Sequence, residues 1–552
     1  MIMLRRLTIL VLIALNPVAF LPLRAQNPQP SGTTVQAPSP SPQPAPRNPV
    51  RISVGRSVAP TTRAELLTRI EEIAHQPALE PGFFAVKIVS LDTGLLIYEQ
   101  NANKFVRPAS NMKLYTVAAA LDRLTPDFHF MTSVYAKEKP NKSGVISDFL
   151  GVKGTGDPSI AARFNSGDYF KGINDLADRI VAAGVKRVKG DLVGDESYFN
   201  GAPLGSGWEW EDLQWAYGAQ VSALSVNDNG IDLTVKPGEK VGAPVVITTG
   251  PPAMSFMTIA NRATTSPRGS KSDLQIYRGL GANTLELSGS IPLGDNGWTG
   301  SVAIPDPALA FISMLRDALI KRGVKIDGRV RTVSSQSIER LPYLERVQPT
   351  GIAVEIASMP SPSFSVIAAQ TLKPSQNQYT EIILRALGEW ARRDLSATRD
   401  YMQDVPKNSE DAGLGVVKKF LRQAGIGEND VALNDGSGLS RNDLISANTT
   451  VQLLTFMSKH KYFAQFRDAL PIAGVDGTLR TRMKGTPAEG NLRAKTGSLS
   501  SVASLSGYVT TAAGEHLAFS MMLNNYPDAG ALRRDSIDAI AVLLASFAGK
   551  TQ

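Results

Sequence analysis

The sequence contains no cysteine and only four histidines in 552 residues. Without cysteine the chain cannot form disulfides, thiolate–zinc sites, iron–sulfur clusters or a cysteine nucleophile. The histidines are scattered, and none belongs to an HExxH or HxH pair: His75, His129, His460 and His516. We therefore expect no metal and no cofactor. A GxSxG segment is also missing, which disfavours a serine triad that depends on histidine.

The chain lacks a strong charge bias and shows no repeat of fixed period. Its composition is 43% apolar and 20% charged, with a net charge of +8, as in an ordinary globular protein of two to four folded units. Lysine and arginine are dispersed and no recognition motif accompanies them, so nucleic acid is not an expected partner. The positive balance fits solubility, or attraction to an anionic membrane surface or cell-wall polymer, and peripheral membrane contact stays open.

The N-terminus has the three-part layout of a secretory signal. Two arginines precede an apolar run over 7–15, a polar break follows, and a small residue, Ala25, marks a cleavage position. The run is shorter than the roughly twenty residues of a membrane span. We predict a signal peptide over 1–25 and export to the periplasm. An uncleaved anchor is the alternative, because residues 20–23 extend the apolar stretch.

The two ends of the chain carry patterns that predict one domain built from distant segments. Residues 83–90 and 95–99 form an expected hairpin, and a helix is expected over 110–124. Near the C-terminus we expect strands at 492–496, 504–510 and 517–523 and a closing helix at 532–547. Antiparallel strands at both ends, with helices between them, predict an α+β fold in which 61–130 and 343–552 form one discontinuous domain.

Composition separates two other segments. Residues 26–60 are dense in Pro, Ser, Gln and Ala, which predicts an extended, disordered tether that buries no core. Residues 131–342 are rich in Gly, Pro, Val and Asp and contain short β-like runs at 231–235 and 245–248. We interpret this region as an insertion of one or two mostly β subdomains, with an inner subdomain at about 228–330.

One helix carries residues that could make a serine nucleophilic without histidine. Ser110, Lys113, Leu114, Val117 and Leu121 fall on one helical stripe, and its apolar members predict that the stripe is buried. Burial lowers the pKa of a lysine toward the neutral amine. A neutral amine one turn from a serine hydroxyl can take its proton. The alternative is that Ser110 caps the helix and Lys113 extends to water.

The other short motifs, taken one at a time, are weak evidence of function. The SxxK spacing recurs at Ser458 and Lys461, and Lys495-Thr496-Gly497 could be a strand that ends in a turn. In the second motif Gly497 allows close approach of another strand, and the side chains of Lys495, Thr496 and Ser498 could bind a carboxylate.

An SxN motif could supply a proton shuttle and a hydrogen-bond donor from one loop. It occurs at Ser375-Gln376-Asn377, and spacing cannot choose between this copy and the copies at Ser225–Asn227, Ser440–Asn442 and Ser446–Asn448.

In the order SxxK, SxN and KTG, these motifs are typical of penicillin-recognising serine enzymes. The chain resembles the class C low-molecular-mass penicillin-binding proteins, the D-alanyl-D-alanine carboxypeptidase/endopeptidase family. The resemblance rests on Arg107-Pro-Ala-Ser-Asn-Met-Lys113, Lys153-Gly-Thr-Gly-Asp-Pro158, Gly194-Asp-Glu-Ser-Tyr-Phe199, Trp208-Glu-Trp210, Asn434-Asp-Gly-Ser-Gly-Leu-Ser-Arg441 and Ala494-Lys-Thr-Gly-Ser498. It spans about 61–549 and implies a β-lactamase-like transpeptidase domain, an antiparallel sheet flanked by helices, interrupted by the insertion.

The resemblance also implies roles for individual residues. It selects Ser375 and Asn377 as the SxN motif, although Gln376 replaces the usual Asp. Ser110 would attack the carbonyl between two D-alanines, with Lys113 as general base. Ser375 would pass the proton to the departing amine, helped by Lys495, and Asn377 would hold the peptide.

Further residues of the substrate site are implied in the same way. Thr496, Ser498 and Arg441 would seat the terminal carboxylate, and Asp195 and Phe199 would reach toward the donor side chain. The backbone N–H groups of Ser110 and Ser498 would form an oxyanion hole. The implied partners are peptidoglycan stem peptides and cross-links, and β-lactam antibiotics.

Two other functions share this fold. A β-lactamase uses the same serine chemistry but deacylates rapidly; the large insertion, and SQN in place of a tyrosine-containing loop, argue against it. A non-catalytic wall-binding protein would lose the chemistry, yet all three motifs are intact here. An esterase of the same fold is a weaker third alternative.

Overall fold

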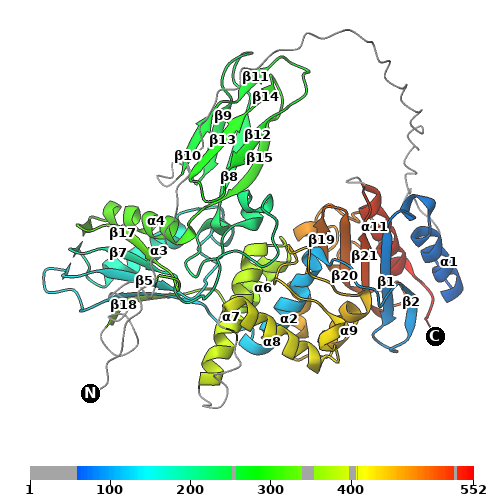
Figure 1. The fold of residues 1–552 in the computed structure, drawn as a ribbon. Coiled ribbons are helices and arrows are strands. Elements are labelled where there is room, and N and C mark those ends of the chain that lie inside the picture. The colour runs from blue at the N-terminus through cyan, green and yellow to red at the C-terminus, as the bar shows by residue number, and fades with distance from the viewer. Residues whose placement is uncertain are drawn as a thin grey trace, which may run out of the picture. The chain divides into compact units, whose positions relative to one another are not determined.

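The computed structural model describes residues 59–251, 257–337, 353–396, 406, 408–527 and 531–551 (Figure 1). The predicted signal peptide, and the predicted tether up to residue 58, lie outside these residues. Within the described part of the chain, no helix combines the length and apolarity that crossing a membrane requires.

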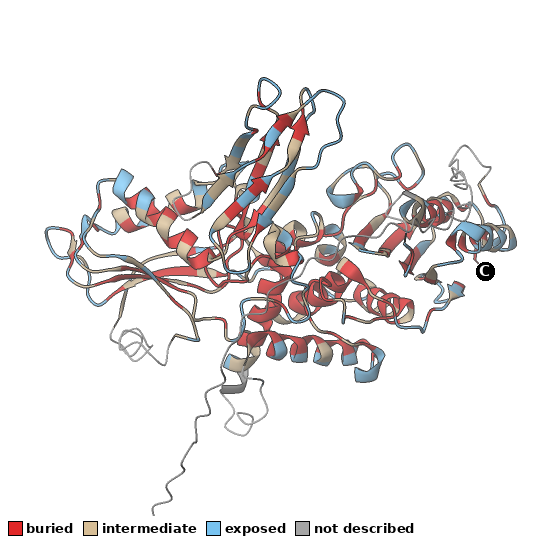
Figure 2. Cartoon of the chain, turned by 45° about the horizontal axis from the view of Figure 1, so that its top comes forward, coloured by how far each residue is buried: buried red, intermediate tan, exposed pale blue. Residues whose placement is uncertain are grey.

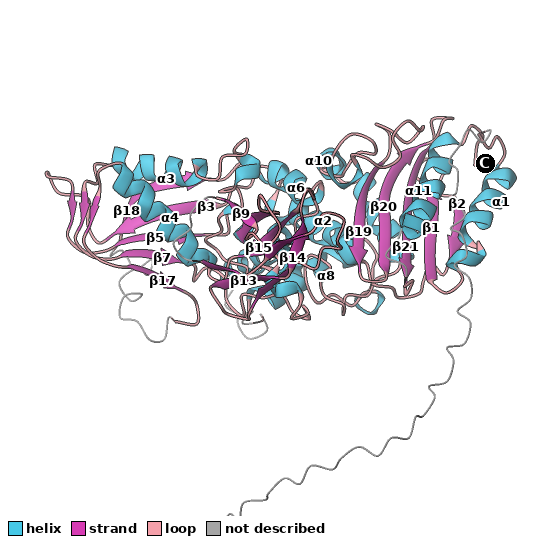
Figure 3. Ribbon diagram, turned by 90° about the horizontal axis from the view of Figure 1, so that it is seen from above, coloured by secondary structure: helices cyan, strands magenta, loops and turns pink. Residues whose placement is uncertain are grey.

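A five-stranded antiparallel sheet joins the two ends of the chain. Its order is β19-β20-β21-β1-β2 (Figure 3). The strands are β1 (Phe83–Ser90), β2 (Leu96–Gln100), β19 (Arg493–Leu499), β20 (Val502–Thr510) and β21 (His516–Asn524). Strand β1 pairs with β21 along its whole length, from Phe83 opposite Asn524 to Ser90 opposite Leu517. The prediction of an α+β fold with an antiparallel sheet is therefore confirmed, and this pairing supports the proposal that the two ends form one domain.

Both faces of this sheet are buried, because successive residues of a strand point to opposite sides. On β1, Phe84 and Val86 belong to one hydrophobic core, whereas Ala85 belongs to another. The first core also contains residues of α1 (Arg63–Ala74) and α11 (Ala531–Ser546). The chain enters α1 through Thr62, whose side chain accepts the N–H of Glu65 and so caps the helix.

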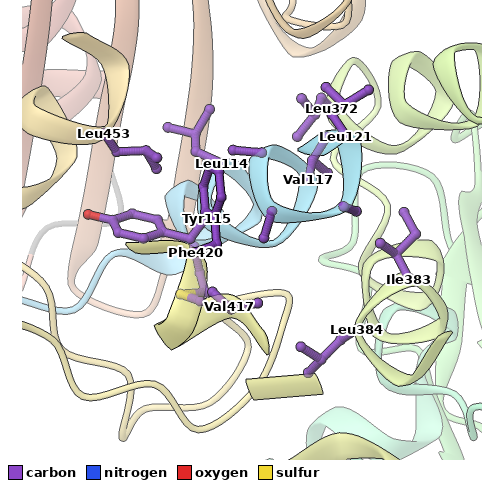
Figure 4. Close-up of a cluster of buried hydrophobic side chains, with 14 of the residues drawn as sticks. Leu114, Tyr115, Val117, Leu121, Leu372, Ile383, Leu384, Val417, Phe420 and Leu453 are labelled. Carbon is purple, nitrogen blue, oxygen red and sulfur yellow. The ribbon is translucent and has the colours of Figure 1, made fainter. Parts of the chain in front are cut away.

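The second core is a layer of helices around α2 (Met112–Leu124). The others are α6 (Phe364–Leu372), α7 (Asn377–Ser396), α8 (Ser409–Gln423), α9 (Ala447–Ser458) and α10 (Phe463–Asp468). Several helices of the chain have one buried and one exposed side in Figure 2. In α2, by contrast, every residue over 112–121 is buried, so the prediction of a single buried stripe was too narrow. Its neighbours include Leu372, Ile383, Phe420 and Leu453 (Figure 4).

The outer part of the insertion is a mixed sheet with the order β17-β7-β5-β3-β18. Its strands are β3 (Met131–Ala136), β5 (Leu150–Gly154), β7 (Leu192–Asp195), β17 (Val330–Val333) and β18 (Val354–Pro360). A second, smaller sheet consists of the short strands β4 (Val145–Ile146), β6 (Arg187–Val188) and β16 (Lys325–Ile326). Helices α3 (Lys171–Ala182) and α4 (Pro307–Lys321) pack together beside it. This subdomain is therefore mixed rather than mostly β.

In the described residues of the inner part, the secondary-structure elements are all strands. They are β8 (Gly230–Lys236), β9 (Val246–Gly250), β10 (Thr258–Asn261), β11 (Thr264–Ser266), β12 (Gln275–Arg278), β13 (Thr284–Ser288), β14 (Ser290–Pro292) and β15 (Trp298–Ala303). They form three small sheets, in the orders β15-β8-β9, β10-β13-β12 and β11-β14.

Two predicted boundaries need correction. The insertion does not end at residue 342, because β18 pairs antiparallel with β3 and extends the inserted sheet to Pro360. The inner subdomain does not reach residue 330, because α4 contacts β7 and β17 of the outer sheet. Each error arose where a segment pairs with a partner far away in the sequence, which local composition does not reveal.

The burial of α2 generates a stability prediction. We expect Leu121→Ala to destabilise the domain by about 2–5 kcal/mol, because it opens a cavity at the contact of α2 with its neighbours. The control is Leu96→Ala on β2, where the side chain is 39% exposed. Urea unfolding followed by tryptophan fluorescence should show a much larger loss for the first variant; equal losses would contradict the packing described here.

Candidate active site

Ser110 lies in a single turn of 3-10 helix, Ala109–Asn111, directly before α2. The turn begins with Ala109 in the left-handed region, at φ 48°, a conformation that is costly for a residue with a Cβ. Asn111 fixes the turn to the sheet, since its Nδ2 donates to Ser506 Oγ on β20 at 2.8 Å. Ser110 itself is half-buried, so its hydroxyl is held in place yet reachable.

The amine of Lys113 is completely buried and has three partners. Its Nζ lies 2.9 Å from Ser110 Oγ, 2.6 Å from Asn377 Oδ1 and 2.7 Å from the carbonyl oxygen of Ser437. The last two are acceptors, and they use the two N–H groups of a neutral amine. The nitrogen lone pair is then left for the hydroxyl of Ser110. This geometry suits Lys113 as the base that activates Ser110.

Electrostatics favour the neutral form of this amine. Burial lowers the pKa of Lys113 to about 7, although the carboxyl groups of Asp435, Glu381 and Asp443 act in the opposite direction. The pKa of Lys495 is also well below its usual value, because Lys495 is buried and lies near Lys113. The free energy needed to charge both amines is high, because they share one buried site.

Ser375 and Lys495 form the second half of the site. Lys495 Nζ donates to Ser375 Oγ at 2.7 Å and to the carbonyl of Thr496 at 2.8 Å. Ser375 has a φ of 65°, so it is a second residue in the left-handed region beside the same site. These contacts choose among the SxN copies, which spacing could not do: only Ser375 and Asn377 are joined here to the two lysines, among the contacts of the described residues.

Strand β19 forms the wall next to Ser110. A Cβ on Gly497 would lie 2.1 Å from Ser504 Oγ, 2.7 Å from the carbonyl of Pro108 and 3.0 Å from the nitrogen of Ser110. Only glycine therefore lets the strand approach the nucleophile.

Two hydroxyls continue this wall. Thr496 Oγ1 donates to Thr478 Oγ1 at 2.7 Å, and Ser498 is exposed. Sequence reasoning missed Thr478, because no motif marks it.

One segment of the insertion reaches this site. Asn377 Nδ2 donates to the carbonyl of Tyr217 at 3.0 Å, which also fixes the orientation of the amide toward Lys113. Arg441 pairs with Asp212 at 2.8 Å and with Glu209 at 3.0 Å. Sequence reasoning missed Asp212 and Tyr217. A signal was available, since three of the five tryptophans lie within 208–215.

Asp195 and Phe199 are placed elsewhere. Asp195 ends β7, is buried, and accepts the N–H of Ser197. Phe199 is buried against Gly156 and Ile382, where a Cβ on Gly156 would lie 2.7 Å from the ring. Phe199 thus packs where the insertion meets α7, and among the contacts of the described residues neither side chain reaches those around Ser110. Arg441 likewise has its guanidinium in ion pairs rather than free for a carboxylate.

Comparisons with known proteins show the family of this chain. The sequence model of the D-Ala-D-Ala carboxypeptidase 3 (S13) family matches residues 66–547. A D-alanyl-D-alanine carboxypeptidase of an Actinomadura strain is 34% identical over 497 residues, which cover 88% of this chain and 85% of the relative.

Solved structures share the fold. The crystal structure of penicillin-binding protein 4 from Haemophilus influenzae aligns with a TM-score of 0.70 at 24% identity, over 85% of this chain and 97% of that one. The same protein complexed with a β-lactam aligns with a TM-score of 0.67 at 23% identity, over the same shares.

The pKa of Lys113 generates a prediction about pH. An amine must be neutral to take a proton. With Lys113 as the base, we therefore expect acylation of Ser110 by benzylpenicillin to be slow in acid and to rise as the pH increases through about 7. Stopped-flow measurement of the acylation rate constant between pH 5.5 and 8.5 checks this. A rate that stays flat across that range, with the protein folded throughout, would rule out a lysine base with this pKa.

Proposed function

Because the chain belongs to the D-Ala-D-Ala carboxypeptidase 3 (S13) family, we propose that it forms its acyl-enzyme on Ser110. The protein is a serine-type D-Ala-D-Ala carboxypeptidase, a hydrolase that acts on peptidoglycan and binds penicillin. The observation that supports this nucleophile most strongly is the buried amine of Lys113, which has two carbonyl acceptors and one hydroxyl, that of Ser110.

In the first step Ser110 Oγ attacks the carbonyl carbon between two D-alanines and its proton moves to Lys113 Nζ. The backbone N–H groups of Ser110 and Ser498 would hold the oxyanion, and losing one such donor costs about 2.7–4 kcal/mol. The C–N bond then breaks, and Ser375, which Lys495 contacts, passes a proton to the departing amine. Water later hydrolyses the ester and regenerates Ser110.

The walls of the site suggest how the substrate lies. Thr496 and Ser498 would bind the terminal carboxylate, next to the amine of Lys495, which donates to Ser375 and to the carbonyl of Thr496. Asn377 would hold the donor peptide. We place the donor side chain against the insertion at Tyr217, which is 44% exposed and touches Asn377 through its carbonyl. Arg441 would act through its pair with Asp212, by keeping this wall in place.

The N-terminal pattern supports a location for this activity. We propose that residues 1–25 are a signal peptide and that the enzyme works in the periplasm, where peptidoglycan is found. The net charge of +8 supports peripheral contact with an anionic membrane surface.

We predict that Ser110→Ala abolishes both covalent penicillin binding and release of D-alanine, a loss of about 10³-fold or more, with the fold intact. The matched control is Ser458→Ala, which alters the second SxxK serine, at the end of α9. Intact mass after brief exposure to benzylpenicillin should show a single adduct on the wild type and the control and none on Ser110→Ala. An adduct on Ser110→Ala would disprove the assignment; drug consumption without an adduct on the wild type would indicate a β-lactamase.

A further inference from the structure

Behind Lys113 lies a loop, residues 434–442, that is organised around one carboxylate. Asp435 is completely buried. Its Oδ1 accepts the backbone N–H groups of Ser437 at 3.0 Å and Gly438 at 2.6 Å. Its Oδ2 accepts the backbone N–H of Ser440 at 2.8 Å, the hydroxyl of Ser437 at 3.2 Å and the indole N–H of Trp208 at 2.9 Å. Five donors around one acceptor-only group fit an ionised carboxylate.

The loop touches the catalytic helix on one side. The carbonyl of Ser437 accepts Lys113 Nζ at 2.7 Å, and the carbonyl of Gly436 accepts Thr116 Oγ1 at 2.8 Å. Gly438 has a φ of 78°, and a Cβ there would lie 1.9 Å from the carbonyl of Ala109, the residue before Ser110. A shift of this loop would therefore move a partner of Lys113 and disturb the turn of the nucleophile.

The insertion touches the same loop on its other side. Trp208 belongs to the insertion, 227 residues away from Asp435 in the sequence. A Cβ on Gly207, at φ 75°, would lie 2.4 Å from Ser440 Oγ, and one on Gly205 would lie 2.4 Å from the indole of Trp208. Close packing thus holds the indole N–H against the carboxylate.

We propose that Trp208 and Asp435 are positioning residues for Lys113, so that the insertion itself takes part in activating the nucleophile. The indole fixes the carboxylate, the carboxylate fixes the loop, and the loop presents the carbonyl of Ser437 to the amine. This role rests on the proposed function, in which Lys113 is the base for Ser110.

The ionisable groups around Lys113 support the positioning role of Asp435. The ionisable groups that face Lys113 are Asp435, Glu381 and Asp443, together with Lys495. Burial raises the pKa of Glu381 to about 8 and that of Asp443 well above its usual value. Asp435, whose five donors fit an ionised carboxylate, is the first of the carboxyl groups that raise the pKa of Lys113.

Two further ionisable groups lie near Glu381. Glu410 and Arg385 act on Glu381, and their side chains lie 3.7 Å apart as a buried pair.

The first test removes the indole N–H alone. In Trp208→Phe we expect the first-order acylation step with benzylpenicillin to slow by about tenfold, with unchanged affinity of the noncovalent complex and one adduct per protein. Trp210→Phe is the control, because Trp210 is 63% exposed in the same segment, and it should react like the wild type. Wild-type rates in Trp208→Phe, or a lower adduct stoichiometry with normal rates in the reacting fraction, would overturn the proposal.

The second test removes the charge. Asp435→Asn should slow the same step and move the midpoint of its pH profile to lower pH, because the ammonium form of Lys113 loses the charge that favours it. In the double variant, Trp208→Phe should slow acylation little beyond the effect of Asp435→Asn alone, since both substitutions act through one contact. Additive effects, or an unchanged midpoint in folded Asp435→Asn, would overturn the proposal. Wild-type acylation in these assays tests the proposed function separately.

Discussion

The amine of Lys113 sits where water is excluded, between two carbonyl oxygens and the hydroxyl of Ser110. A charged ammonium is costly there, and burial lowers the pKa of Lys113 to about 7, so that the neutral amine is well populated near neutral pH. Much of the structure can be understood from this one constraint. Helix α2 must be buried on all sides, a sheet and five other helices must enclose it, and polar atoms must be delivered to one point inside a core.

Those polar atoms come from segments that are far apart in the sequence. Ser110 and Lys113 belong to the N-terminal portion. Ser375 lies just before α7, Asn377 is the first residue of α7, and Lys495 lies on an edge strand. The pairing of β1 with β21 brings the two ends of the chain together. Left-handed backbone at Ala109 and Ser375 shows that the enclosing structure overcomes local preference on both sides of the site.

The insertion is part of this enclosure rather than an appendage. Its contacts reach Asn377 through the carbonyl of Tyr217, Arg441 through Asp212 and the loop behind Lys113 through Trp208. Each contact orients a group that itself touches, or supports, the catalytic side chains. Buried polar networks of this kind are useful only when every member is satisfied, because an unpaired member costs more than an apolar residue would. The tight glycines at 205 and 207 are consistent with that requirement.

The sequence by itself determined the motifs, the strands and helices at both ends, and the expected chemistry of Ser110, Lys113, Ser375, Asn377 and Lys495, because local pattern and residue type carry that information. Only the tertiary structure decided which SxN copy faces the lysines and that β18 pairs with the inserted sheet. It also decided that Tyr217 contacts Asn377, Asp212 contacts Arg441 and Trp208 contacts Asp435, while Asp195 and Phe199 are buried elsewhere. The physical reason is the same in each case. These facts depend on contacts between residues far apart in the chain, and a single sequence records which side chains exist but not which distant backbone brings them within hydrogen-bonding distance.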